Sequence, residues 1–271
     1  MSLRSLNIHP HFTRMDCVRI VTEFTESEIS ALVHPEWFEA FPWLLQGTTT
    51  RGSAGAPPFD FGLFGETSRP REARERWSTL QQRLGARGVV YSQQVHGADV
   101  CEYEEHSSGI SGLELVDPCD GHVTSTPGLL LAVTAADCVP VFVIDPERRA
   151  VAVLHAGWRG AAAGVIESGV KKMASAFASR AEDLRLHMGP AICGTCYEVG
   201  PEVFAALREP VPDRPAPIDL RYVLAEHAVR LGVSRAAVTI SAHCTICTES
   251  GLFSHRKGHR ERQVGYIGVL D

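Results

Sequence analysis

The chain has 271 residues, of which 44% are hydrophobic and 21% are charged, and its formal net charge is -6 at neutral pH. This composition is close to the globular average, which excludes a disordered or fibrous chain, and the length suits one large α/β domain. The negative charge offers no basic field for nucleic acid, and the sequence contains no apolar run of about 18 residues that could span a bilayer. We therefore expect a folded protein whose partners are small molecules, with no nucleic acid or membrane.

The cysteines and the first residues indicate the compartment. Residues 1–16 lack the apolar stretch of a secretory signal, so we expect a cytoplasmic protein. Eight cysteines in such a protein are expected to be thiols or metal ligands rather than disulfides. Both a monomer and a homodimer are compatible with the sequence.

The first third of the chain alternates between unclear and regular patterns. Residues 1–32 have no clear period, which predicts an N-terminal extension or edge element before a domain over residues 33–271. A Gly/Ala/Pro-rich loop covers residues 51–58, where glycines allow the backbone to approach a ligand. The regular elements predicted here are a strand over 43–50, a helix over 69–84 and a strand over 89–93.

The rest of the chain interleaves short apolar runs with helical patterns. Residues 208–217, with four prolines, are predicted to form an exposed excursion. The alternation of strands and helices without a fixed repeat length indicates an α/β or α+β fold. The predicted strands are 129–134, 139–144, 150–154, 184–188, 236–241 and 264–270, and the predicted helices are 160–178 and 219–231.

Three potential metal ligands stand where apolar strands are expected to end. His96, Cys138 and His155 provide two imidazoles and one thiolate, which zinc accepts, and three protein ligands leave a fourth position for water, as in a catalytic site. The same residue types also fit two hydrogen-bonded core histidines and an inert buried cysteine. Cys138 and His155 are therefore candidates both as ligands and as catalytic groups.

Candidate anion-binding and proton-transfer groups flank these ligands. The segment after His155, Ala-Gly-Trp-Arg-Gly, turns from strand into helix, so that Arg159 and backbone N–H groups could face a phosphate. Arg51 is a second candidate phosphate contact, although both arginines could simply be solvated. Asp137, beside Cys138, could orient a ligand or transfer a proton, or could be an ordinary turn residue.

Two Cys-x-x-Cys pairs form a second possible metal site. Cys193 with Cys196 and Cys244 with Cys247 would supply the four thiolates of a closed structural zinc site. The long separation between the pairs and the lack of a Gly/Lys-rich knuckle weigh against this interpretation. The sequence leaves the role of these pairs open.

Beyond these single residues, a series of motifs resembles the purine nucleoside phosphorylase family, long labelled multicopper polyphenol oxidoreductase or laccase-like, which includes YfiH-like bacterial members. The resemblance covers residues 35–271 and ends with Phe-Ser-His-Arg over 253–256 and Arg-Gln-Val-Gly over 262–265. The motifs are Thr-Thr-Arg at 49–51, Gln-Val-His-Gly at 94–97, Asp-Gly at 120–121, Thr-Ala-Ala-Asp-Cys-Val-Pro at 134–140, His-Ala-Gly-Trp-Arg-Gly at 155–160, Gly-Pro-Ala-Ile at 189–192, Cys-Tyr-Glu-Val-Gly at 196–200 and Cys-Thr at 244–245.

The resemblance implies a fold, a metal and an activity. It implies a single compact domain with mixed β-sheets covered by helices, and metal ligands at His96, Cys138 and His155. It implies phosphorolysis of adenosine, inosine, guanosine and methylthioadenosine to base and ribose 1-phosphate, together with deamination of adenosine to inosine. Zinc would activate water for deamination, and Arg51 and Arg159 would orient phosphate.

The sequence departs from the family pattern at several positions. Asp60 stands where the family often has asparagine, and its negative charge near an anion-binding loop could weaken phosphate binding. His255 replaces the usual tyrosine, and Cys193 and Cys247 are additions of this chain. Phosphorolysis is therefore the less secure part of the expected activity.

Other functions fit parts of the same pattern. Two histidines and a cysteine also suit copper, as in a laccase-like polyphenol oxidoreductase, although the chain's His-x-His pair, His9 and His11, lies outside the matched motifs. Cys138 with His155 could form a Cys/His hydrolase, and a hydrolase that edits peptidoglycan precursors is a further alternative. A zinc ion with four protein ligands would indicate a purely structural role.

Overall fold

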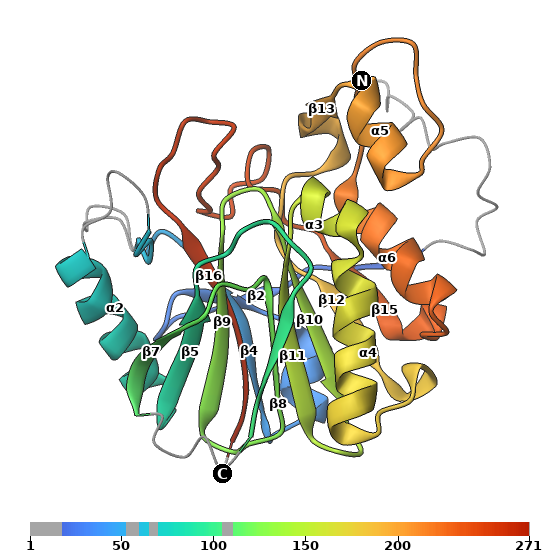
Figure 1. Cartoon of the computed structure of the whole chain (residues 1–271). Helices are drawn as coiled ribbons and strands as arrows, with labels where there is room; N and C mark the ends of the chain where they lie inside the picture. The colour runs from blue at the N-terminus through green and yellow to red at the C-terminus, as the bar shows by residue number, and fades with distance from the viewer. Residues whose placement is uncertain (1–17, 53–59, 65–69, 105–110, 271) are drawn as a thin grey trace.

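The structure is a computed structural model that describes residues 18–52, 60–64, 70–104 and 111–270. Two large mixed sheets pack face to face, and helices cover the outer face of each sheet (Figure 1). This arrangement confirms the expected mixed α/β class. No helix within the described ranges is long and apolar enough to cross a membrane.

The first sheet has seven strands in the order β1-β15-β12-β10-β11-β8-β6. Its centre is antiparallel, with β10 between β11 and β12, whereas β15 runs parallel to both β12 and β1. The strands are β1 (Arg19–Val21), β6 (Val100–Tyr103), β8 (Gly121–Thr124), β10 (Val139–Asp145), β11 (Ala150–Ala156), β12 (Arg185–Met188) and β15 (Val238–Ser241).

The second sheet also has seven strands, in the order β2-β3-β4-β16-β9-β5-β7. At its centre β16 runs antiparallel to both β4 and β9. The strands are β2 (Phe24–Glu26), β3 (Ala31–Val33), β4 (Leu44–Thr49), β5 (Gly88–Ser92), β7 (Gly112–Val116), β9 (Leu129–Ala135) and β16 (Gln263–Val269).

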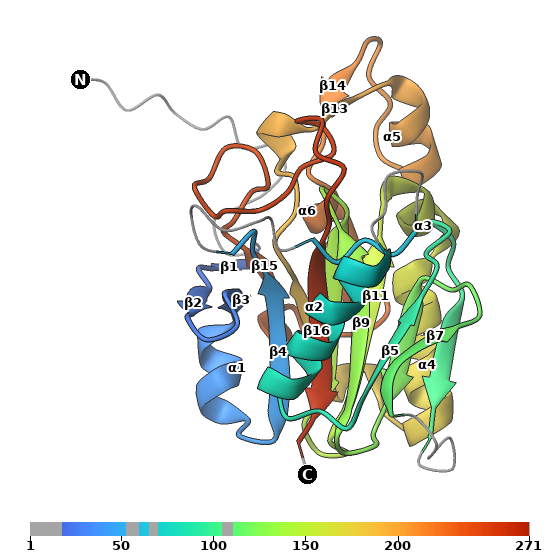
Figure 2. The same ribbon diagram turned by 90° about the vertical axis from the view of Figure 1, so that its left-hand side faces the viewer.

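The helices lie mainly outside the two sheets. α4 and α6 pack on the first sheet, and α2 packs on the second (Figures 1 and 2). The helices and short elements are α1 (Pro35–Ala40), α2 (Pro70–Arg83), α3 (Trp158–Ala163), α4 (Val165–Phe177), α5 (Pro201–Leu207), α6 (Leu220–Arg230), the 3-10 turns η2 (Ala181–Asp183), η3 (Gly194–Cys196) and η4 (Arg235–Ala237), and a small pair, β13 (Glu198–Val199) with β14 (Ala216–Pro217).

The central strands are apolar throughout because both of their faces are buried. Along β9, Leu131 and Val133 face the layer between the sheets, whereas Leu130 and Ala132 face the layer under α2, where Trp77 is fully buried. This explains the continuous apolar runs in the sequence and confirms the buried strands predicted over 129–154.

One expectation about the elements changes. The single helix expected over 160–178 is wrong: α3 and α4 meet at Gly164, whose φ of 88° belongs to the left-handed region that glycine adopts without strain. Residues 1–32 were expected to form an extension or edge element; residues 1–17 lie outside the described residues, and the remainder supplies β1 and β2, each at the edge of one sheet, and the start of β3.

Candidate metal centre

Three separate segments bring His96, Cys138 and His155 together. His96 lies in the loop from β5 to β6, Cys138 stands just before β10, and His155 lies near the end of β11. Their potential ligand atoms all lie within 4.8 Å of one another, and Sγ of Cys138 is 3.9 Å from Nε2 of His96. The strands thus gather the three predicted ligands into one site.

The carboxylate of Asp120 connects the two histidines. One oxygen lies 2.9 Å from Nδ1 of His155, and the two oxygens accept the backbone N–H groups of Val95, His96 and Gly97 at 3.1, 3.0 and 2.7 Å. Because His155 Nδ1 is engaged, Nε2 is left to bind a metal. Histidines that bind a metal usually donate their other ring N–H to a carboxylate or a carbonyl in this way.

The backbone around the site is strained at two residues. His96 has a φ of 60° and Asp137 a φ of 89°, which side-chain-bearing residues seldom adopt. Gln94 stabilises the loop of His96, since its amide donates to the Thr134 carbonyl at 2.7 Å and accepts from the Thr134 N–H at 2.8 Å. Such strain is common where a fold aims side chains at a ligand.

Two glycines make room for the ligands. A Cβ on Gly157 would lie 3.0 Å from Cδ2 of His96 and 3.1 Å from Sγ of Cys138. A Cβ on Gly160 would lie only 2.8 Å from the carbonyl oxygen of Gly97. The glycines of the His-Ala-Gly-Trp-Arg-Gly motif therefore permit close packing of α3 against the loop that carries His96.

Cys138 favours the charge state that binds a metal, whereas His155 must lose a proton to do so. Burial raises the pKa of Cys138, but His155 and His96 outweigh this effect and bring it down to about 6. Burial lowers the pKa of His155, but Cys138 and Asp120 raise it to about 9. Without a metal, the site therefore holds a thiolate beside an imidazolium, and a cation that binds the thiolate would displace the imidazolium proton.

The donor set fits a transition metal. Two imidazole nitrogens and one thiolate sulfur suit zinc or copper. His96 is exposed, so the site can be reached from solvent, and His155 is buried with its carboxylate partner. This combination is typical of a metal site that admits a small molecule rather than one closed by protein on all sides.

Asp137 lies beside Cys138, but its carboxylate is engaged. One oxygen accepts the hydroxyl of Thr245 at 2.5 Å, and the other accepts the backbone N–H of Arg256 at 2.7 Å. These bonds connect Asp137 to the long connection between β15 and β16. Its proposed part in proton transfer stays a prediction.

The two predicted phosphate contacts differ in their surroundings. The guanidinium of Arg51 donates to the carbonyl of Leu252 at 3.0 Å and lies 3.1 Å from the His259 ring. Arg159 is exposed, and its guanidinium lies over the Trp158 ring, 4.4 Å from the centroid. Arg159 therefore has more freedom to meet an anion than Arg51 has.

The Asp60 carboxylate is held by backbone groups, and the Arg76 guanidinium donates to the Asp60 carbonyl at 2.9 Å. The carboxylate accepts the N–H groups of Gly62 and Arg262 at 2.9 and 2.8 Å. Residues 53–59 of the neighbouring loop lie outside the described residues.

Sequence reasoning assigned no role to Asp120 or Tyr197, although both stand in the quoted motifs. The pKa of Tyr197 is raised overall, by burial first and then by Cys138, while Arg256 and Arg159 act in the opposite direction. The Tyr197 phenol therefore responds to the charges of the candidate site. Asp120 stands directly before β8, and only the pairing of β8 with β11 places it beside His155, so its role had no local signal in the sequence.

The two Cys-x-x-Cys pairs form a second cluster. The sulfur atoms of Cys193, Cys196, Cys244 and Cys247 all lie within 4.8 Å of one another. The long separation of the two pairs along the chain, which weighed against a shared zinc site, was therefore a wrong guide, because the fold brings the pairs together in space. Only this cluster and the His96 site appear as possible metal-binding groups among the described residues.

Comparison with known proteins gives the chain its relatives. A family model described as multi-copper polyphenol oxidoreductase laccase matches residues 46–270. A protein named purine nucleoside phosphorylase from Mycobacterium tuberculosis is 36% identical over 78% of this chain and 85% of its own length. A protein named adenosine deaminase RL5, from an unknown prokaryotic organism, is 32% identical over 65% of this chain and 68% of its own length.

A solved structure agrees with these relatives. The crystal structure of YlmD from Geobacillus stearothermophilus has a TM-score of 0.80 and 25% identity, covering 93% of this chain and all of its own. Its sequence, named purine nucleoside phosphorylase YlmD, is 32% identical over 66% of this chain and 71% of its own length. The fold and the motifs around His96, Cys138 and His155 thus agree with the comparisons, and the chain belongs to the YfiH-like family described as multi-copper polyphenol oxidoreductase laccase.

Proposed function

We propose that this chain is a zinc-dependent enzyme that processes purine nucleosides. The reactions are phosphorolysis of adenosine, inosine, guanosine or methylthioadenosine to base and ribose 1-phosphate, and deamination of adenosine to inosine. The observation that carries the proposal is the convergence of His96, Cys138 and His155 on one point that solvent can reach. Relatives named purine nucleoside phosphorylase and adenosine deaminase supply the substrate class.

The donor chemistry supports zinc as the metal. A thiolate with two neutral imidazoles is a ligand set that zinc accepts in catalytic sites. When bound, zinc supplies a Lewis acid that lowers the pKa of water to about 7 and thus makes it a nucleophile at neutral pH. Asp120 supports this role by fixing the ring orientation of His155 through its 2.9 Å contact with Nδ1.

The remaining residues of the proposal position substrates and protons. Arg159, exposed over Trp158, and Arg51 carry the charge that phosphate requires. Phosphate held beside the nucleoside attacks the anomeric carbon of the ribose while the glycosidic C–N bond breaks, so that ribose 1-phosphate forms and the purine base leaves and takes up a proton. The benefit of holding both substrates in this way is their orientation. Asp137, whose carboxylate accepts the Thr245 hydroxyl, is the proposed proton-transfer group.

The test is an incubation of zinc-loaded protein with adenosine, in the presence and absence of phosphate, followed by chromatography of bases and nucleosides. We expect adenine only with phosphate and inosine in both conditions. The Cys138→Ala variant, which loses one ligand, should lose both products. Cys101→Ala, a half-buried thiol on β6, is the matched control and should keep both activities.

Absence of turnover in both conditions by correctly folded, zinc-loaded protein would overturn the nucleoside assignment. Inosine without adenine would retain the deaminase and remove the phosphorylase part. Equal activity of Cys138→Ala and Cys101→Ala would separate the reaction from this site.

Copper chemistry is a second candidate because the family model carries the description of a multi-copper oxidoreductase. A multicopper oxidase needs several histidines in one cluster, and the two possible metal-binding groups among the described residues contain just two histidines, His96 and His155. Oxidation of a phenolic dye by copper-loaded protein, with no nucleoside turnover under zinc, would favour this alternative.

A further inference from the structure

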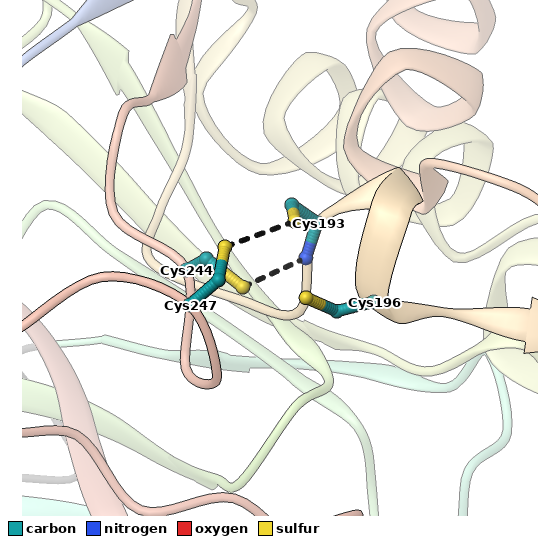
Figure 3. Close-up of side chains that lie close together, drawn as sticks. All are labelled: Cys193, Cys196, Cys244 and Cys247. Carbon is teal, nitrogen blue, oxygen red and sulfur yellow. Dashed lines mark hydrogen bonds between the residues drawn. The ribbon is translucent and has the colours of Figure 1, made fainter.

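The second cluster of possible ligands lies between two loops at one end of the sheets. Cys193 directly precedes η3 and Cys196 is its last residue, in the segment after β12, and Cys244 and Cys247 lie in the connection after β15. Figure 3 shows the four side chains pointing toward one another from these two segments. Because β12 and β15 are parallel neighbours, both segments leave the sheet at the same end.

The spacing of the sulfur atoms matches a tetrahedral metal site. Sγ of Cys193 lies 3.6 Å from Sγ of Cys247, and all four sulfurs lie within 4.8 Å of one another. Zinc–sulfur bonds of about 2.3 Å place the corners of a tetrahedron about 3.8 Å apart. A disulfide would bring two sulfurs to about 2 Å, and all four of these cysteines are free thiols.

Hydrogen-bond donors surround the sulfurs as they do around metal-bound thiolates. The backbone N–H groups of Cys193 and Ile246 both donate to Sγ of Cys244 at 3.3 Å. The hydroxyl of Thr195 lies 3.1 Å from Sγ of Cys193. Donors to sulfur stabilise the charged thiolate, the form that binds metals.

Contacts that do not involve the sulfur atoms also hold both segments in place. The N–H of Gly194 donates to the Asp219 carboxylate at 3.0 Å, and Arg221 bonds both that carboxylate and the carbonyl of Ser241. Ala191 forms a β-bridge with Cys244. Arg221 is buried and paired with Asp219, so this pair anchors both segments without adding net charge beside the sulfurs.

We propose that Cys193, Cys196, Cys244 and Cys247 bind a structural zinc ion, separate from the His96, Cys138 and His155 site. Four protein ligands leave no position for a substrate, so the ion joins two segments rather than taking part in a reaction. The joined connection, residues 242–262, carries Thr245 and the Arg256 N–H, both bonded to Asp137 beside Cys138. The ion therefore stabilises one wall of the candidate catalytic site.

The experiment isolates this cluster by removing the other site. Cys138→Ala protein, purified under reducing conditions with zinc and freed of excess metal, is analysed for metal content. We expect one zinc ion per chain. Adding Cys196→Ser and Cys247→Ser should remove that ion, whereas adding Cys101→Ser should leave it in place. Cobalt in the Cys138→Ala protein should show the intense sulfur-to-metal charge transfer of a tetrahedral thiolate site.

Several results would overturn the proposal. These are Cys138→Ala protein without bound metal, disulfides joining the four cysteines in freshly purified reduced protein, or an iron-sulfur absorption spectrum. No nucleoside enters these measurements, so their outcome is independent of the proposed activity. In protein that retains Cys138, Cys196→Ser with Cys247→Ser should also speed tryptic cleavage at Lys257 and Arg260, while Cys101→Ser should not.

Discussion

Asp120 is the residue that combines the most functions in the candidate site. Its carboxylate is fully buried, and it orients His155 while it accepts three N–H groups from the loop of His96. These bonds and His155 outweigh burial, which by itself would raise the pKa, so that the pKa of Asp120 is lowered and the carboxylate stays charged. One side chain thus sets the positions of two of the three predicted ligands.

Replacing this carboxylate should weaken metal binding. Asp120→Asn keeps the volume but loses the charge that makes His155 a better ligand, so we expect metal affinity to fall roughly 10-fold to 100-fold. Competition with a chromophoric chelator measures this change in the Cys196→Ser, Cys247→Ser background, which leaves one site. Asp117→Asn, on the exposed segment before Asp120, is the matched control and should bind as tightly as the parent. Equal affinities of the two variants would contradict the role given to Asp120.

At the scale of elements, the sequence predicted the longest strands, whose two faces are buried, and missed several short ones. β9, β10 and β11 are buried at every position, so that their apolar runs are unambiguous. β6 and β7 are partly exposed, and β1 has only three residues, so none of them leaves a pattern of its own. Their place in the sheets depends on pairing partners far away in the chain.

The two metal clusters also differ in how far local sequence patterns reveal them. His96, Cys138 and His155 were predictable because polar residues stood at the ends of apolar strands and in matched motifs. The four-cysteine cluster depends on β12 and β15 being parallel neighbours, which no local pattern reveals. Asp120 depends similarly on the pairing of β8 with β11.

The turn from β11 into α3 provides a test at this scale. Gly157 has a φ of -80° and a ψ of 173°, which alanine adopts, so Gly157→Ala adds a methyl group without backbone strain. That methyl group would press on His96 and Cys138 at 3.0 and 3.1 Å. We therefore expect weaker metal binding, again measured by chelator competition. The metal-free variant should unfold at nearly the same temperature as its metal-free parent. Unchanged metal affinity would contradict this prediction, because it would mean that His96 and Cys138 can shift to accommodate the methyl group and still bind the metal as tightly.

At the scale of the whole molecule, the layer between the sheets also buries titratable groups. His122 is fully buried, and its Nε2 lies 3.2 Å from the hydroxyl of Ser92. Burial lowers its pKa to about 4, against a small opposing effect of Asp120. His34, also fully buried, has a pKa lowered to about 3, again by burial first.

These histidines should make the fold sensitive to acid. Below a pH of about 6.5, His122 binds a proton in the unfolded chain but not in the folded protein. Its contribution to the free energy of unfolding is therefore complete above that pH and is lost progressively toward pH 4. His122 alone contributes a loss of up to roughly 3 kcal/mol. Urea unfolding at several pH values should show a shallower decline for His122→Gln than for the parent. His255→Gln, at an exposed position, should keep the parental slope. Identical slopes for all three proteins would contradict the burial effect.

The position of β16 has a consequence for how the chain reaches this fold. β16 is the central strand of the second sheet, yet its partner β4 lies far away in sequence, and the N–H of Val264 donates to the Thr49 hydroxyl across 215 positions. Closing such a loop costs chain entropy before the pairing repays it, and folds rich in distant pairings form slowly. Until β16 arrives, β4 and β9 each present an unpaired edge that another molecule can join. Refolding yield should therefore fall as protein concentration rises.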